Sequence, residues 1–153
     1  MRVMVFGTFD NLHPGHLHYF WSAWCFGARE AGKIIRGSKV KSNEIVAVIA
    51  RDQNVLKIKG RLPLQNEKER ATVVRQAFKT VGWPSQVVLG SLTDRWAVLK
   101  KYRPDFIALG YDQQVDIRQL KKVLASAGLF CVVKRLRSYH PELYKSSYFR
   151  RKE

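Results

Sequence analysis

The chain has 153 residues, of which 46% are hydrophobic, and its 28 Lys and Arg against 12 Asp and Glu give a formal net charge of +16. This length suits one domain, residues 1–153, with a core of its own. No apolar run is long enough to cross a bilayer, and the N-terminus enters a strand-like run directly instead of a signal peptide, so we expect a cytoplasmic protein without a membrane span. Cys25 and Cys131 stand far apart in apolar surroundings and are expected to be free, buried thiols.

The excess of basic residues bears on the choice of ligand. A basic chain with Trp and Tyr residues is also typical of nucleic-acid-binding proteins, and a non-catalytic protein of that kind is one alternative. No recognised nucleic-acid-binding module is visible, however, and a triphosphate with a phosphorylated substrate would occupy only a few of the 28 cations. We expect the remaining Lys and Arg side chains to form a solvated surface.

Short apolar runs alternate with longer amphipathic stretches along the chain. This alternation predicts an α/β fold, a Rossmann-like, doubly wound parallel sheet of about five strands with helices on both faces. Ligands of such folds bind beyond the carboxyl ends of the strands. The predicted strands are residues 2–6, 45–50, 86–89, 106–109 and 130–135, and the predicted helices are residues 14–29, 66–79, 94–101, 115–126 and a short one after Ser146.

Two histidines stand three residues apart between the first strand and the first helix. Pro14 suits the first turn of a helix, and a helix N-terminus favours anions because its N–H groups are unpaired and its dipole end is positive. His13 and His16 fall on one face of that helix, so both rings can address one phosphate-bearing ligand. Zinc is the alternative ligand of a histidine pair. No third His, Cys or carboxylate is spaced to complete a zinc site, so we predict no metal-ligating residue.

The run Gly7-Thr8-Phe9-Asp10-Asn11-Leu12-His13-Pro14-Gly15-His16 resembles the signature G-T-F-D-x-x-H-x-G-H of the cytidylyltransferase-like nucleotidyltransferases. That family includes glycerol-3-phosphate cytidylyltransferases, phosphopantetheine adenylyltransferases and archaeal-type FAD synthases. The resemblance implies that His13 and His16 contact the α- and β-phosphates of a nucleotide and that Thr8 contacts the phosphate near the first strand. It also implies nucleotide-binding roles for Gly7, Phe9, Asp10 and Gly15.

The resemblance further implies direct nucleotidyl transfer, in which a substrate phosphate oxygen attacks the α-phosphate of a nucleoside triphosphate and pyrophosphate leaves. No nucleophilic side chain is needed, because positioned donors and cations stabilise the charge that accumulates on the phosphate oxygens. We expect Mg²⁺ to accompany the triphosphate, held mainly by phosphate oxygens and water. The resemblance also suggests a homodimer.

Residues 27–43 form a basic, glycine-containing stretch that departs from the family, whose members pass more directly from the first helix to the second strand. We expect this stretch to extend the helix and then to loop. A surface insertion and a mobile lid are both compatible with its composition.

The segment after the second strand resembles the part of the family that contacts the phosphate of the acceptor. Lys57 and Lys59 are two residues apart, so in an extended loop both would face the same way and could clamp one phosphate; solvated charge is the alternative. Arg70 matches a Glu-Arg position that opens the next helix, and its planar guanidinium can hold two phosphate oxygens. We therefore assign Lys57 and Arg70 to the acceptor and expect Asp52 to fix the loop.

The fourth predicted strand ends in Gly110-Tyr111-Asp112-Gln113, which resembles the family's G-x-D-Q/W element. The resemblance implies close backbone approach of the nucleotide at Gly110 and places Asp112 and Gln113 beside the nucleoside. A carboxylate there can accept from ribose hydroxyls or from an amino group of the base. The alternative is that Asp112 caps the helix predicted near Val115.

Lys145-Ser146-Ser147, within a predicted phosphate-binding helix over residues 144–153, resembles the family's I-S-T/S-T/S element, whose hydroxyls and amides hold the β- and γ-phosphates. Lys145 replaces the apolar residue that is usual in cytidylyltransferases. The combined motifs are most similar to archaeal-type FAD synthases, which implies ATP and FMN as substrates. Glycerol 3-phosphate with CTP, and phosphopantetheine with ATP, stay open as alternatives.

Overall fold

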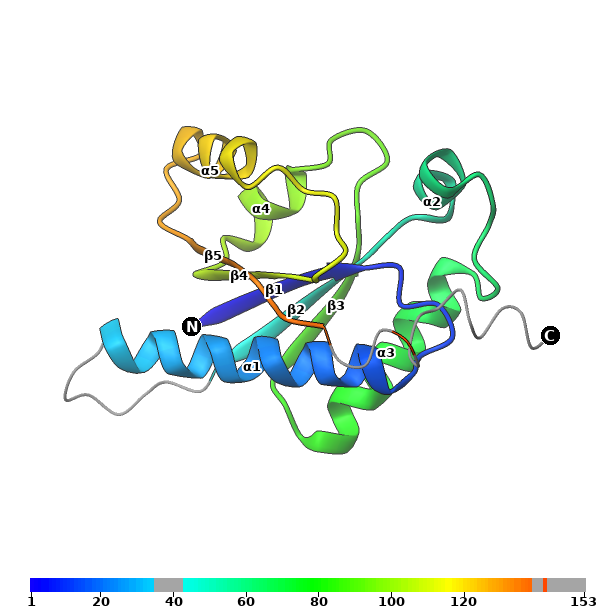
Figure 1. Cartoon of the computed structure of the whole chain (residues 1–153), viewed down its shortest axis with the longest axis horizontal. Helices are drawn as coiled ribbons and strands as arrows, with labels where there is room; N and C mark the ends of the chain where they lie inside the picture. Colours follow the sequence, from blue (N-terminus) through cyan, green and yellow to red (C-terminus); the bar gives the residue numbers. More distant parts are fainter. Residues whose placement is uncertain (35–42, 139–141, 143–153) are drawn as a thin grey trace.

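The computed structural model describes residues 1–34, 43–138 and 142. Within these residues the centre of the molecule is a sheet of five strands, all paired in parallel, in the order β3-β2-β1-β4-β5 (Figure 1). The strands are β1 (Arg2–Gly7), β2 (Glu44–Ile49), β3 (Ser85–Leu89), β4 (Phe106–Leu109) and β5 (Val132–Arg135).

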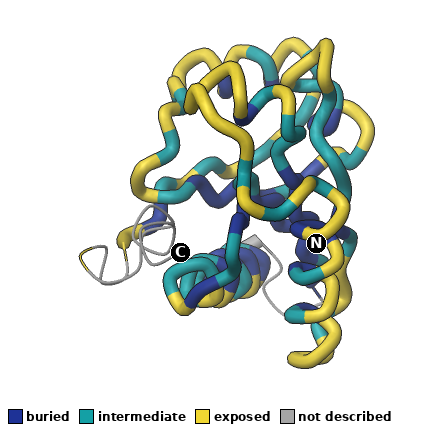
Figure 2. The backbone as a smooth tube through the Cα atoms, turned by 90° about the vertical axis from the view of Figure 1, so that its right-hand side faces the viewer, coloured by how far each residue is buried: buried dark blue, intermediate teal, exposed yellow. Residues whose placement is uncertain are grey.

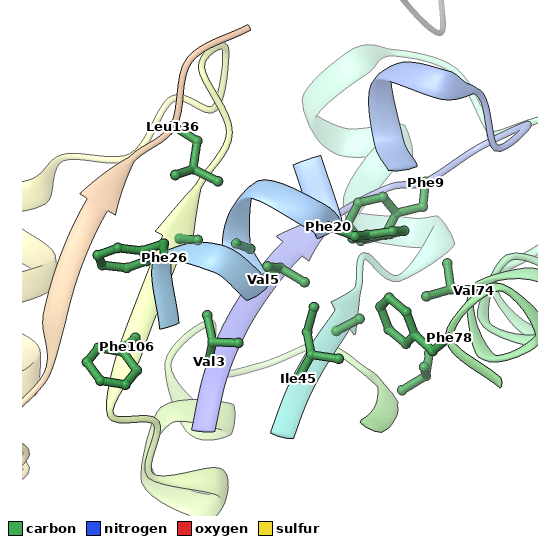
Figure 3. Packing of buried hydrophobic residues seen from close by; sticks show 14 of the residues in the cluster. Val3, Val5, Phe9, Phe20, Phe26, Ile45, Val74, Phe78, Phe106 and Leu136 are labelled. Carbon is green, nitrogen blue, oxygen red and sulfur yellow. The ribbon is translucent and has the colours of Figure 1, made fainter. Parts of the chain in front are cut away.

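Helices cover both faces of the sheet, which confirms the predicted doubly wound α/β fold. The described helices are α1 (Pro14–Ile34), α2 (Asp52–Lys59), α3 (Glu67–Val81), α4 (Ala97–Tyr102) and α5 (Ile117–Ser126). α1 and α3 pack on one face, where Val5, Phe20 and Phe78 belong to one cluster (Figure 3). α4 and α5 pack on the other face, and Leu99 and Leu120 belong to its core.

The position of each strand in the sheet explains its sequence. All four residues of β4 and five of the six residues of β2 are buried, because helices cover both sides of these strands. In the edge strand β5, exposed residues alternate with half-buried ones. Figure 2 shows the buried residues gathered along the sheet and on the sides of the helices that face it.

The order of the strands creates a switch point between β1 and β4. The chain runs outward from β1 through β2 to β3, returns to β4 on the other side of β1, and continues to β5. Ligands of open parallel sheets bind at such a point, outside the carboxyl ends of the strands. In Figure 1 these ends lie on the right, next to α2 and the first turn of α1.

The observed helices differ from the predicted ones mainly in α1 and α2. α1 continues to Ile34, so the expected extension of the helix into residues 27–43 is confirmed as far as residue 34; residues 35–42 lie outside the described residues. α2 occupies a segment for which we predicted an extended loop. It ends at Gly60, which adopts a left-handed φ of 72°. Asn66 and Glu69 form a capping box that starts α3 one residue later than predicted.

The prediction that both cysteines are buried is wrong. Cys25 is exposed on α1 and Cys131 is partly buried; both thiols are free. Burial raises the pKa of the Cys131 thiol to about 12, and the charge of Asp105 adds to this effect. Among the described helices, none combines the length and the apolar character that a membrane span requires. The predicted helix over 144–153, with Lys145, Ser146 and Ser147, lies outside the described residues.

Candidate active site

The start of α1 holds His13 and His16 in a stacked pair, with ring centroids 3.8 Å apart and ring planes inclined by 24°. Each Nδ1 accepts a backbone N–H: that of His13 from Gly15 at 3.1 Å, and that of His16 from His13 at 3.3 Å. A neutral imidazole whose Nδ1 accepts a hydrogen bond carries its proton on Nε2. The first turn of α1 therefore fixes the tautomer of both rings and makes Nε2–H the donor of each.

Both rings are uncharged at neutral pH. The pKa of His16 is lowered to about 3, mainly by burial. The charges of His13 and Lys59 lower it further, and the charge of Asp10 raises it. Burial also lowers the pKa of His13. The pair thus offers hydrogen-bond donors without adding positive charge to the site.

Phe9 turns its ring into the core, where it is 3% exposed. The ring lies 4.8 Å from that of Phe20 and meets the His16 ring edge-on at 5.6 Å, both measured between centroids. A Cβ at Gly7 would lie 2.6 Å from the Phe9 ring, which explains the glycine at position 7. Phe9 adopts a left-handed φ of 52°, which is uncommon for an aromatic residue. The ring therefore supports His16 from within the core, and the nucleotide contact of Phe9 stays a prediction.

Asp10 is also turned inward and is 4% exposed. Its two carboxylate oxygens accept the backbone N–H groups of Leu64 at 2.8 Å and Gln65 at 3.0 Å. In the opposite direction, the side-chain oxygen of Gln65 accepts the N–H of Asn11. Asp10 thus ties the loop after β1 to the loop between α2 and α3. The predicted contact between Asp10 and the nucleotide stays a prediction.

Arg70 is 0% exposed, and its guanidinium is bonded to protein groups. Its guanidinium donates to the backbone carbonyls of Gln65, Thr8 and Ala50 and to the carboxylate of Asp52, the last at 2.7 Å. These groups come from the ends of β1 and β2, from the first residue of α2 and from the loop that precedes α3. Arg70 therefore has a positioning role in this structure, and its contact with the acceptor stays a prediction. The bonds of Asp52 confirm that this residue fixes the loop.

The first turns of α2 and α3 cap each other through Asp52 and Glu67. The N–H of Asp52 donates to the Glu67 carboxylate at 2.9 Å, and the N–H of Glu67 donates to the Asp52 carboxylate at 3.1 Å. Arg51 pairs with Glu67 at 3.1 Å. The bonds from Asp52 and Arg51 keep the pKa of Glu67 below its usual value, although desolvation by burial opposes them as the largest single influence. This reciprocal arrangement sets α2 at the carboxyl edge of the sheet.

Because α2 is a helix, its two lysines do not face the same way. Residues two apart on a helix point roughly 200° apart, so Lys57 and Lys59 cannot clamp one phosphate as an extended loop would allow. Both are exposed. The charge of Lys59 acts on His16, so Lys59 is the lysine of α2 that the structure brings to the histidine pair.

The polar tip after β4 is held by bonds within the protein. The Gln113 side chain accepts from the N–H of Gly110 at 3.0 Å and donates to the carbonyl of Phe6, which joins the ends of β4 and β1. A Cβ at Gly110 would lie 3.4 Å from the Gln113 side chain, so it is this side chain that approaches the backbone of Gly110 closely. The predicted contact between Gln113 and the nucleoside stays a prediction. Asp112 is exposed, and α5 is capped by Asp116 instead of Asp112.

Two positioning residues were not found from the sequence. The Tyr19 hydroxyl donates to the carbonyl of Ala108 at 2.7 Å, and burial raises the pKa of this hydroxyl. Arg135 on β5 donates to three carbonyls of the segment after β4, those of Gly110, Gln113 and Val115. Neither residue belongs to a motif, because each acts on backbone atoms that are distant in the sequence.

The histidine motif after β1 and the Gly-Tyr-Asp-Gln tip after β4 thus meet at the switch point, as the sequence predicted. The Lys59 end of α2 adds a positive charge there. The side chain of Thr8 is half-buried at the end of β1, and its phosphate contact stays a prediction. The fold and this edge define a Rossmann-like α/β protein, a class whose members bind ligands beyond the carboxyl ends of their strands. The phosphate site at the start of α1 stays a prediction.

Comparisons with known proteins agree with this class. Residues 4–152 match the cytidylyltransferase-like family, and the chain belongs to it and is a nucleotidyltransferase. It is 43% identical to the FAD synthase of Korarchaeum cryptofilum over 135 residues, which cover 88% of this chain and 80% of that protein. It is 36% identical to the FAD synthase of Pyrococcus abyssi over 146 residues, which cover 95% of this chain and 83% of that protein.

A solved structure of a lipopolysaccharide core biosynthesis protein from Thermoplasma volcanium superposes with a TM-score of 0.68 at 29% identity, covering 91% of this chain and 98% of that one. A protein of unknown function from Archaeoglobus fulgidus shares the fold, with a TM-score of 0.59 at 17% identity over 90% of each chain.

Proposed function

We propose that this chain is an FMN adenylyltransferase that joins the AMP part of ATP to FMN and releases pyrophosphate. The observation that carries the proposal is the stacked, uncharged histidine pair at the start of α1, which lies at the switch point of the sheet. The curated relatives described above, which are FAD synthases, support FMN as the acceptor and ATP as the nucleotide. ATP and FMN would both bind outside the carboxyl ends of β1 and β4.

In the proposed reaction, a phosphate oxygen of FMN forms a bond to the α-phosphorus of ATP. The bond from that phosphorus to the oxygen that bridges to the β-phosphate breaks, and pyrophosphate leaves with the electron pair. Negative charge grows on the bridging and non-bridging oxygens during this step. The Nε2–H groups of His13 and His16 donate to these oxygens, and the positive end of the α1 dipole adds to the stabilisation.

Mg²⁺ fits this site as a companion of the triphosphate. In the described ranges, no three His, Cys, Asp or Glu side chains gather as metal ligands. Both oxygens of Asp10, a carboxylate whose charge acts on His16, are bonded to backbone N–H groups. The magnesium nucleotide would therefore be held through its phosphates by His13 and His16. When bound, Mg²⁺ neutralises phosphate charge and makes the α-phosphate easier to attack.

Further contacts complete the proposal. Lys59, whose charge acts on His16, would contact a phosphate bound there, and the exposed Asp112 would accept from ribose hydroxyls. The roles of Thr8, Lys57, Lys145, Ser146 and Ser147 stay predictions, as does the cytoplasmic location.

The proposal is tested with purified protein, ATP or CTP, and either FMN, glycerol 3-phosphate or phosphopantetheine, with Mg²⁺ present throughout. Pyrophosphate release and chromatographic detection of the product are measured together. We expect FAD and pyrophosphate in equal amounts from ATP and FMN only. Turnover of CTP with glycerol 3-phosphate, or no turnover with any pair, would contradict the proposal.

A further inference from the structure

A surface hollow of about 360 Å³ lies where α5 ends and the chain turns into β5. Side chains of α5 and of the segment before β5 line it: Lys121, Leu124, Ala125, Leu129, Phe130 and Cys131. Its volume falls within the range of about 300–1,000 Å³ that is usual for ligand pockets. Because β5 is parallel to β4, the hollow lies at the amino edge of the sheet, whereas the histidine pair lies at the carboxyl edge. The hollow is therefore separate from the candidate active site.

Phe130 gives the hollow an exposed aromatic ring. It is 102% exposed, and the next most exposed large hydrophobic residue of the described chain, Ile58, is 84% exposed. A ring in this position gains nothing from the core and is open for stacking on another flat ring. The hollow thus offers a ligand an apolar surface with a ring on which it can stack.

Three cations lie along α5 next to the hollow. Arg118, Lys121 and Lys122 are all exposed, and their spacings of three and four residues place them on one face of the helix. None of the three forms an ion pair with an acidic residue in the described part of the chain. The carboxylate of Asp116 caps α5 by accepting the N–H groups of Arg118 and Gln119. This face of α5 therefore carries uncompensated positive charge.

The basic surface continues onto α4, which covers the same face of the sheet as α5 (Figure 1). Like α5, α4 runs toward the amino edge of the sheet, because it connects two parallel strands. Its last turn carries the exposed Lys100 and Lys101, and the exposed Arg103 follows directly. We call the two groups together the α4–α5 cations: Lys100, Lys101, Arg103, Arg118, Lys121 and Lys122.

We propose that the hollow and the α4–α5 cations bind single-stranded nucleic acid, with one base stacked on Phe130 and the phosphates held by the cations. A row of cations beside an exposed aromatic ring is the arrangement with which proteins hold single strands, because unpaired bases present their faces while the backbone repeats its charge. Each phosphate that is neutralised also releases counterions. The net charge of +16 favours such a partner at long range.

Two other polyanions fit the hollow less well. The base faces of a duplex are stacked inside the helix, so a duplex offers the cations phosphates but offers Phe130 no ring. A membrane surface offers negative charge but no flat ring to fill the hollow. We therefore assign this surface to single strands.

Fluorescence anisotropy with the purified, nuclease-treated protein tests the proposal. The probe is a labelled oligouridylate of about 12 nucleotides, a length within the site sizes of single-strand binders. We expect a Kd below about 10 μM at about 50 mM salt, and an association constant that falls with salt at a log–log slope of about −2, as about three phosphate contacts require. The absence of binding at about 100 μM protein would overturn the proposal.

A duplex of the same oligouridylate with oligoadenylate, and vesicles of phosphatidylcholine with phosphatidylserine, test the two other polyanions. The duplex should bind at least fivefold more weakly than the single strand, because its bases cannot reach Phe130. The vesicles should not compete with the single strand. Equal affinity for the duplex, or displacement of the oligouridylate by the vesicles, would overturn the proposal.

Two pairs of variants locate the binding surface. Lys121→Glu and Phe130→Ser should each raise the Kd at least fivefold, because they remove a phosphate contact and the stacking ring. The matched controls are Lys79→Glu and Val81→Ser at the exposed end of α3, on the other face of the sheet. Both controls should change the Kd less than about twofold, and all four variants should keep the circular dichroism of the parent. Equal losses in Lys121→Glu and Lys79→Glu would show binding spread over the whole basic surface and would overturn the proposal.

Photocrosslinking uses the unaltered chain and does not depend on the folding of a variant. Trypsin releases residues 123–134 as one peptide, because Lys122 precedes it and Lys134 ends it. An oligonucleotide that contains 4-thiouridine should crosslink to this peptide. MgATP at about 1 mM should leave the yield equal to that of a control at the same ionic strength, because ATP is expected at the other edge of the sheet. Crosslinks to the peptide with His13 and His16, or displacement by MgATP, would overturn the proposal and place the strand in the candidate active site.

Discussion

His13 and His16 each use one ring nitrogen to accept a backbone N–H at the start of α1. The proton of each neutral ring is thereby placed on the other nitrogen before any ligand arrives. A donor that is oriented in advance needs little reorganisation when charge develops on a phosphate oxygen. An alanine supplies no such donor. A water molecule that took the place of the ring would have to be ordered before it could donate.

We therefore expect His16→Ala to lower kcat for pyrophosphate release by about 100-fold, the usual effect of losing one oriented donor. His18→Gln is the control, because His18 lies on the same helix but outside the stacked pair. It should leave kcat within about twofold of the parent. A loss of less than about twofold in His16→Ala would mean that the ring does not contact the reacting phosphates.

The histidine pair also makes stability depend on pH. The pKa of His16 is about 3 in the folded protein against 6.5 in the unfolded chain, so the unfolded chain binds more protons between these values. The contribution of His16 to the free energy of unfolding is complete above pH 6.5. It is lost as the pH falls toward 3, at no more than about 1.4 kcal/mol per pH unit. Denaturant unfolding between pH 7.5 and pH 5 measures it, and His16→Gln should flatten the dependence. An equally steep dependence in this variant would show that other groups cause it.

At single positions, the sequence predicted which residues lie near the site but not always which way they point. The spacing of His13 and His16 and the helix start at Pro14 predicted the pair correctly. Phe9, Asp10 and Arg70 were assigned to ligands because the motif names them, yet each is buried on protein groups. The atoms that hold Asp10 and Arg70 include groups more than fifty residues away, so a local pattern cannot reveal them.

The junction of α2 and α3 depends on Arg70 more than on any local signal. Replacing Arg70 by Met would leave three backbone carbonyls and the Asp52 carboxylate without this donor in a buried place. We expect a loss of about 3–5 kcal/mol in the free energy of unfolding. Arg75→Met on the same helix is the control, because Arg75 donates to the carbonyl of Val87 at the long distance of 3.3 Å. This substitution should cost less than about 1.5 kcal/mol.

Urea unfolding of both variants checks this expectation. If Arg70→Met is as stable as the parent and only the KM for FMN rises, Arg70 contacts the acceptor and the positioning role is wrong.

The helical form of α2 separates the roles of its two lysines. Lys59→Ala should lower kcat/KM by about tenfold, since it removes a charge near the phosphates that bind at His16. Lys57→Ala is the matched control, because the same change is made on the other side of the helix. Steady-state kinetics with ATP and FMN compare the two, and equal losses would indicate that both side chains reach one ligand.

The sequence could not predict α2 because its start is not capped by a neighbouring residue. Its first N–H is accepted by Glu67, fifteen residues further along the chain. The run from Asp52 to Lys59 therefore looks like a basic loop when it is considered alone. α3, whose capping box is formed by Asn66 and Glu69, carries its own signal and was predicted to within two residues at each end.

For the molecule as a whole, the alternation of apolar runs and amphipathic stretches was sufficient to predict the fold. The central strands β2 and β4 are buried on both sides and show as continuous apolar runs. The right-handed crossovers that such units favour agree with the helices, since α1 and α3 cover one face and α4 and α5 the other, but they do not set the order of the strands. Which residues meet above the switch point depends on the loops, and their conformations rest on contacts such as Gln113 with Phe6.

The Asp10 carboxylate also couples the motions of two loops at the carboxyl edge of the sheet. It accepts from Leu64 and Gln65 while Gln65 accepts from Asn11, so neither loop can open without releasing the other. In deuterium exchange, the amides of Asn11, Leu64 and Gln65 should therefore share one opening rate, as members of a single cooperative unit. Asp10→Asn should separate these rates; if the parent already exchanges them independently, the two loops fluctuate separately and admit substrates one at a time.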